Sequence, residues 1–90
     1  MDFRFEFDEA KSASNKEKHG IDFVEAQKLW SGGVLVEMPA RSLEDEQRWA
    51  AIGLVGEKHW VAFYTLRSES IRLISVRRAR PREIEYYESR

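Results

Sequence analysis

The second half of the chain carries basic residues that could bind an anion such as phosphate. Residues 46–90 hold nine basic and six acidic side chains, a net charge of +3, whereas residues 1–45 hold six basic and ten acidic, a net charge of −4. Eight of those nine basic residues are arginines, whose planar guanidinium donates paired hydrogen bonds suited to phosphate. Since the whole chain has a net charge of only −1, the concentration of arginines in residues 46–90 favours a local anion-binding site over a protein that is basic throughout. The alternative is that the arginines only solubilise strand ends.

Four of these arginines flank one predicted hairpin. Arg67 and Arg72 lie on either side of a short turn, so the two side chains could approach each other. Arg77 and Arg78 follow at the opposite end of the hairpin. A strict two-residue repeat places Arg72 and Arg78 on one face of their strand and Arg77 on the other. The sequence therefore predicts arginines that are divided between two faces.

Candidate acid–base groups are few. His19 could act as a general acid or base, or its imidazole could instead serve as a helix-end residue that bonds the last carbonyls. The two histidines, His19 and His59, lack a metal-ligand spacing, no aspartate-rich loop suits calcium, and the chain has no cysteine. We therefore expect no bound metal and no cofactor.

An α+β fold is predicted to position these groups. Asp8 and Gly20 have the residue types that begin and end a helix, and Pro39 is expected to stop a strand. Short separators between the later strands imply antiparallel hairpins, with the strand at 58–66 in the centre because both of its faces are mostly apolar. The predicted elements are strand 3–7, helices 9–18 and 22–30, strands 34–36, 48–55, 58–66 and 71–76, and a helix from 81.

Length and composition fit a single domain over residues 1–90. Hydrophobic residues make up 42% and charged residues 34% of the chain, and the 12% of aromatic residues argues against disorder. No apolar run approaches the roughly 18–20 residues that a membrane span needs. The first ten residues have no apolar signal segment, so we expect a cytoplasmic protein.

Short motifs occur in a specific order from about Phe5 to Tyr87. They begin with Phe7-Asp8-Glu9-Ala10-Lys11, and the most specific are Lys18-His19-Gly20 and Ile74-Ser75-x-Arg77-Arg78-Ala79 together. With these motifs the chain resembles the BrnT family of ribonuclease toxins from bacterial type II toxin–antitoxin pairs. Trp30 and Val76 depart from the family pattern, where phenylalanine and alanine are expected, and neither is a polar candidate.

The resemblance implies a RelE-like fold, an antiparallel sheet with two N-terminal helices packed on it and a C-terminal helix. It implies metal-independent RNA cleavage that blocks translation. It also implies a BrnA-like antitoxin with a ribbon-helix-helix DNA-binding part, so that operator DNA is contacted only through the antitoxin. No membrane contact is implied.

Cleavage without a metal proceeds by attack of the RNA's own 2′-hydroxyl on the adjacent phosphate, which requires cationic donors, a base and an acid. With the resemblance, the predicted catalytic residues are Arg67, Arg77, His19 and Glu46. The predicted RNA-binding residues are Lys11, Tyr64, Arg72, Arg78 and Tyr87.

Two other functions compete with the nuclease. One is a non-enzymatic adaptor whose arginine-rich surface docks a protein partner. The other is a direct DNA-binding module, which is disfavoured because the sequence contains no basic recognition helix.

Overall fold

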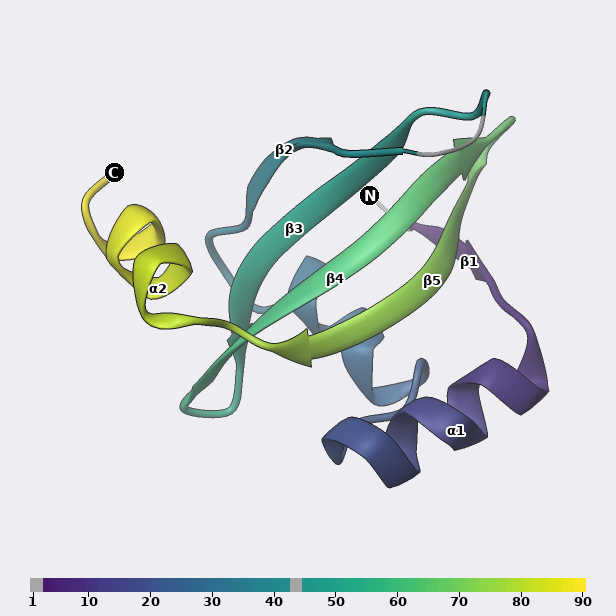
Figure 1. The fold of residues 1–90 in the computed structure, drawn as a ribbon, viewed down its shortest axis with the longest axis horizontal. Helices are drawn as coiled ribbons and strands as arrows, with labels where there is room; N and C mark the ends of the chain where they lie inside the picture. Colours follow the sequence, from purple (N-terminus) through teal and green to yellow (C-terminus); the bar gives the residue numbers. More distant parts are fainter. Residues whose placement is uncertain (1–2, 43–44) are drawn as a thin grey trace.

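A computed structural model describes residues 3–42 and 45–90 (Figure 1). Its five strands form one sheet in the order β1-β5-β4-β3-β2. The elements are β1 (Arg4–Glu6), α1 (Glu9–His19), the 3₁₀ helix η1 (Glu25–Trp30), β2 (Val36–Ala40), β3 (Arg48–Val55), β4 (Lys58–Arg67), β5 (Ser70–Arg78) and α2 (Pro81–Glu88). No helix of the described ranges is long and apolar enough to cross a membrane.

The sheet is mixed, so the expectation of a wholly antiparallel sheet is wrong. β3, β4 and β5 pair antiparallel, as the short separators predicted, and β2 also pairs antiparallel with β3. β1 instead runs parallel to β5, with Arg4 opposite Ser70 and Glu6 opposite Arg72. This pairing joins residues more than 60 positions apart in sequence. Turn sequences indicate only how consecutive strands are connected, so they could not predict this long-range parallel pairing.

The first helix is confirmed. Asp8 Oδ1 accepts a hydrogen bond from the Lys11 backbone N–H at 3.1 Å, which caps the N-terminus of α1. Gly20 ends the helix with φ of 83°, a left-handed conformation that glycine adopts without steric cost.

The predicted second helix is a short 3₁₀ helix. Asp22 and Glu25 cap its start reciprocally: Asp22 Oδ1 accepts from the Glu25 N–H at 2.7 Å, and Glu25 Oε1 accepts from the Asp22 N–H at 3.0 Å. The most buried residues of this segment are Phe23, just before η1, and Ala26 and Leu29 within it, spaced by three. Three residues per turn place these side chains on one face. Leu29 therefore completes the apolar face of this segment, and Trp30 packs against the same core only partly buried.

β2 starts and ends later than predicted. It continues through Pro39, which lies opposite Trp49 of β3. Proline is tolerated here because β2 is an edge strand, where a missing N–H costs no ladder hydrogen bond on the open side.

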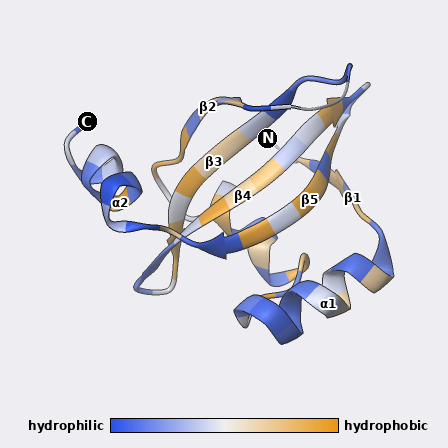
Figure 2. Cartoon of the chain, viewed as in Figure 1, coloured by the Kyte–Doolittle hydropathy of each residue, from blue (hydrophilic) through white to orange (hydrophobic). Residues whose placement is uncertain are grey.

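β4 is the central strand, as predicted. One face of the sheet carries Trp60, Ala62 and Tyr64 in a core shared with η1. The opposite face carries Val61 in a smaller core with Tyr87 of α2. Apolar residues are concentrated on β3, β4 and β5, whereas α1 is largely hydrophilic (Figure 2). We call these the η1 face and the α2 face of the sheet.

A β-bulge in β5 changes which arginines share a face. Phe63 lies opposite Ser75 but Tyr64 lies opposite Leu73, so Ile74 is an extra residue in β5. The extra residue inverts the alternation of side chains between the two faces of the sheet beyond it. A strict two-residue repeat, which assumes an uninterrupted ladder, therefore assigns the wrong faces there. The consequence is that Arg67, Arg72 and Arg77 lie on the α2 face, whereas Arg78 lies on the η1 face opposite Trp60. The prediction that Arg72 and Arg78 share a face is wrong.

Asn15 joins α1 to the edge of β5 just after the bulge. Its Nδ2 donates to the Val76 carbonyl at 2.8 Å and to the Ile21 carbonyl at 2.9 Å, and the Val76 N–H donates to Asn15 Oδ1 at 3.1 Å. In the described chain β1 pairs only with Ser70–Arg72 of β5. The Asn15 amide therefore takes the place of a neighbouring strand at Val76.

The first prediction concerns this buried amide. Asn15→Ala should lower the free energy of unfolding by at least about 2 kcal/mol, since it leaves buried backbone groups without partners. Thermal denaturation should show a fall of about 10 °C. Glu17→Ala, at an exposed position of the same helix, should change stability by less than about 0.5 kcal/mol. Equal melting temperatures for the two variants would contradict this role.

Candidate functional site

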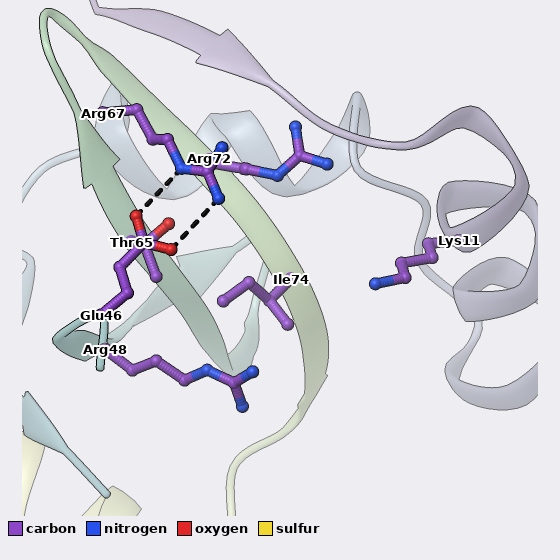
Figure 3. A pocket seen from close by; sticks show the side chains of 7 residues that line it. All are labelled: Lys11, Glu46, Arg48, Thr65, Arg67, Arg72 and Ile74. Carbon is purple, nitrogen blue, oxygen red and sulfur yellow. Dashed lines mark hydrogen bonds and ion pairs between the residues drawn. The ribbon is translucent and has the colours of Figure 1, made fainter. Parts of the chain in front are cut away.

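A polar pocket of about 210 Å³ opens on the α2 face, at the end of the sheet where β4 turns into β5. Figure 3 shows side chains that reach it from several elements. The described residues that line it are Lys11, Glu46, Arg48, Thr65, Arg67, Arg72 and Ile74. Four of them are cations and one is a carboxylate, so the pocket is suited to an anion.

The sheet register brings the pocket's residues together. Thr65 lies opposite Arg72 across the β4–β5 ladder, and Arg67 follows Thr65 by two residues on the same face. Arg48 begins β3 on the neighbouring side. Lys11 arrives from α1, and Figure 3 shows its amino group pointing toward β5.

Glu46 and Arg67 form an ion pair in the pocket. Arg67 Nε donates to Glu46 Oε2 at 2.9 Å and Arg67 Nη2 donates to Oε1 at 3.1 Å, a bidentate arrangement. The hydrogen bonds from Arg67 lower the pKa of the Glu46 carboxyl, and the charges of Arg72 and Arg48 lower it further. Glu46 is therefore ionised at neutral pH.

Arg72 is held by the parallel strand. Its guanidinium Nη1 lies 3.6 Å from Glu6 Oε1, and Glu6 is its register partner on β1. The β1–β5 pairing thus places a cation at the rim of the pocket.

Arg77 lies away from the pocket. Its Nη1 and Nη2 each donate to a Glu83 carboxylate oxygen at 2.8 Å, and its guanidinium lies 5.3 Å from the centre of the Phe63 ring. Glu83 also accepts from the Arg80 N–H at 2.7 Å at the start of α2. Because of these bonds, with Arg77 as the main cause, the pKa of Glu83 is lowered. The Arg77–Glu83 pair therefore anchors α2 to the sheet.

His19 lies in a neighbouring pocket of about 180 Å³, which shares Lys11 and Ile74 with the first. Eight residues separate Lys11 and His19 along α1, which is about 12 Å at 1.5 Å per residue. Lys18 also lines this second pocket.

Three predicted RNA-binding residues are not brought to the pocket. Tyr64 is 2% exposed on the η1 face and its hydroxyl donates to Glu37; burial is the main cause that raises its pKa. Tyr87 is 3% exposed and its hydroxyl donates to the Val34 carbonyl at 2.8 Å. Arg78 stacks on Trp60, 5.4 Å from the ring centre. Both tyrosine rings are packed in the two cores, so neither offers a free ring face to a base.

Sequence reasoning missed two residues of the pocket, Arg48 and Thr65. For both residues, the sequence contained a pattern that could have identified them. Arg48 begins a predicted strand, and Thr65 precedes Arg67 by two residues in the central strand, which places the two on one face. A search for polar residues on one face of the hairpin would have found Thr65. Among the residues that the structure describes, no group of three or more histidine, aspartate or glutamate residues could hold a metal ion.

The fold and the pocket define a small α+β protein whose pocket is lined mainly by cations. Comparison with known families shows that residues 7–83 match the family described as "Ribonuclease toxin, BrnT, of type II toxin-antitoxin system". The chain therefore belongs to the BrnT family of ribonuclease toxins, as the motifs indicated. Membership of a type II system implies a protein antitoxin as partner. No curated protein matches the chain.

A second prediction follows from the lowered pKa of Glu83. The ion pair with Arg77 contributes fully above the ordinary pKa of 4.5 and is lost as the pH falls through the lowered pKa of the folded state. Glu83→Gln should therefore lower the melting temperature at pH 7 by about 5 °C, for a loss of about 1 kcal/mol. It should also reduce the further loss between about pH 5 and pH 3.

The matched control is Glu85→Gln on the same helix, because Glu85 is exposed. Thermal melts across this pH range should give Glu85→Gln the profile of the wild type. Identical profiles for Glu83→Gln and the wild type would contradict the anchoring role.

Proposed function

We propose that this BrnT-family protein cleaves RNA at the pocket between β4, β5 and α1, without a metal ion. The observation that carries the proposal is the bidentate Glu46–Arg67 pair, set among further cations that line one pocket. A carboxylate held on an arginine fork occupies the kind of position that a phosphate can take.

The reaction is a transesterification of the RNA backbone. The 2′-oxygen forms a bond to phosphorus while the bond from phosphorus to the 5′-oxygen breaks, which leaves a 2′,3′-cyclic phosphate and a 5′-hydroxyl. Glu46, ionised at neutral pH, accepts the proton of the 2′-hydroxyl. Arg67 and Arg72 stabilise the charge that develops on the phosphorane oxygens. Lys11 supplies the proton to the leaving 5′-oxygen.

The remaining predicted residues act around this centre. His19, in the adjoining pocket, contacts the neighbouring nucleotide, while Arg77 supports the site indirectly through Glu83 and α2. We further infer that the fold is RelE-like. The antiparallel core of the sheet and the preceding N-terminal helices support this assignment.

In the cell, the cleavage blocks translation in the cytoplasm. The antitoxin is BrnA-like and carries a ribbon-helix-helix part, so that the pair contacts operator DNA through the antitoxin. The family match and the cationic pocket support this role.

The nuclease proposal predicts the effect of one arginine. Arg67→Ala should slow RNA cleavage by about 10²- to 10³-fold, because it removes a donor that stabilises the transition state. Its side chain is 50% exposed, so stability should change by less than about 1 kcal/mol. The measurement is cleavage of an RNA oligonucleotide in excess EDTA, paired with thermal melts.

Arg82→Ala is the matched control, because Arg82 is exposed on α2, outside the pocket. It should cleave at the wild-type rate. Full activity of Arg67→Ala would remove that arginine from the site. Cleavage that requires added magnesium would contradict the metal-free mechanism, and a folded wild type without any nuclease activity would favour the adaptor.

A further prediction concerns the antitoxin. We expect it to cover the pocket with acidic residues, since this silences the site and speeds association electrostatically. Arg67→Glu and Arg72→Glu should each slow association and flatten its dependence on salt, whereas Arg82→Glu should not. Kinetics measured across salt concentrations test this, and unchanged rates for both pocket variants would place the antitoxin elsewhere.

A further inference from the structure

The hydroxyl of Thr65 is buried in the pocket without a hydrogen-bond partner. Thr65 is 2% exposed, and its Oγ1 is the buried side-chain polar atom that lacks a partner in the described part of the chain. Buried hydroxyls normally find a partner, because folding removes the water that solvated them. A valine has nearly the same shape and suits a strand equally well, so packing alone does not account for this hydroxyl.

The position of Thr65 points to a ligand. The side chain faces Arg72 across the ladder and shares its face with Arg67. Figure 3 shows it among the side chains of Glu46, Arg48 and Arg67, which also line the pocket. The unpartnered hydroxyl thus lies where the surrounding cations concentrate an anion.

We propose that the Thr65 hydroxyl donates a hydrogen bond to a non-bridging oxygen of an RNA phosphodiester. This proposal rests on the proposed nuclease function. A phosphodiester carries no proton, so every group that binds its oxygens must be a donor. Guanidinium groups are donors only, and a hydroxyl adds a neutral donor between them without charge repulsion. Glu46 is an acceptor when ionised and cannot share this task.

The side chains around the hydroxyl can yield to such a ligand. The side chains of Arg67 and Glu46 are 50% and 39% exposed, so both can rotate. When a phosphate binds the guanidinium of Arg67, it displaces the Glu46 carboxylate from that guanidinium. A phosphate oxygen then reaches the Thr65 hydroxyl. The hydroxyl therefore has a hydrogen-bond partner when the ligand is bound and none in the ligand-free protein.

Two variants separate the hydroxyl from the shape of the side chain. Thr65→Val keeps the shape and loses the donor, whereas Thr65→Ser keeps the donor and loses a methyl group. The probes are a cleavable RNA oligonucleotide and its 2′-O-methyl analogue, which cannot attack its own phosphate. The measurements are kcat/KM for the first, Kd for the second, and the melting temperature of each protein.

Thr65→Val should melt at or above the wild-type temperature, because it removes a buried hydroxyl that has no partner. It should bind the analogue about tenfold more weakly and cleave about 10- to 100-fold more slowly, as expected when a hydrogen bond to a charged group is lost. Thr65→Ser should melt at a lower temperature yet stay within a few-fold of the wild type in binding and cleavage.

Wild-type affinity in Thr65→Val would overturn the proposal, and so would a melting temperature several degrees below the wild type, which would make the hydroxyl a structural group. If the wild type binds the analogue but cleaves no RNA, the nuclease function fails while the comparison of Kd values still tests Thr65. If the wild type does not bind the analogue, both proposals fail.

Discussion

The buried amide of Asn15 at the edge of β5 is the contact on which the site depends. β1 covers only the first part of this edge, and Asn15 bonds to the Val76 backbone beyond it. That contact fixes the position of α1 against the sheet. Lys11 lies one helical turn before Asn15 and reaches the pocket from the side. An amide that looks merely structural therefore determines where a cation of the site can be.

The bulge at Ile74 determines on which face of the sheet each arginine of the hairpin lies. With it, Arg72 and Arg77 share the α2 face, and their roles separate along that face. Arg72 lines the pocket and pairs with Glu6, whereas Arg77 is bound to Glu83 and holds α2. Of the three hairpin arginines on this face, Arg67 and Arg72 therefore line the anion site, and Arg77 attaches the C-terminal helix.

Local signals in the sequence were sufficient for most elements. Asp8, Gly20 and the short separators identified α1 and the antiparallel hairpins, because caps and turns are local features. The parallel β1 and the bulge depend on long-range pairing that no single window contains. For the same reason, the sequence could assign Arg67 and Glu46 to one site but could not predict their bidentate contact. The burial of the Tyr64 ring was not foreseen.

The central claim is that the pocket between β4, β5 and α1 receives the RNA phosphate. NMR spectra of the arginine side-chain Nε–H groups, recorded during titration with 2′-O-methyl RNA, test this most directly. The account predicts that the signals of Arg67 and Arg72 shift as the RNA binds, while that of Arg78, on the opposite face and stacked on Trp60, stays in place. A shift of the Arg78 signal with no change at Arg67 and Arg72 would contradict the account, because the RNA would then bind the η1 face.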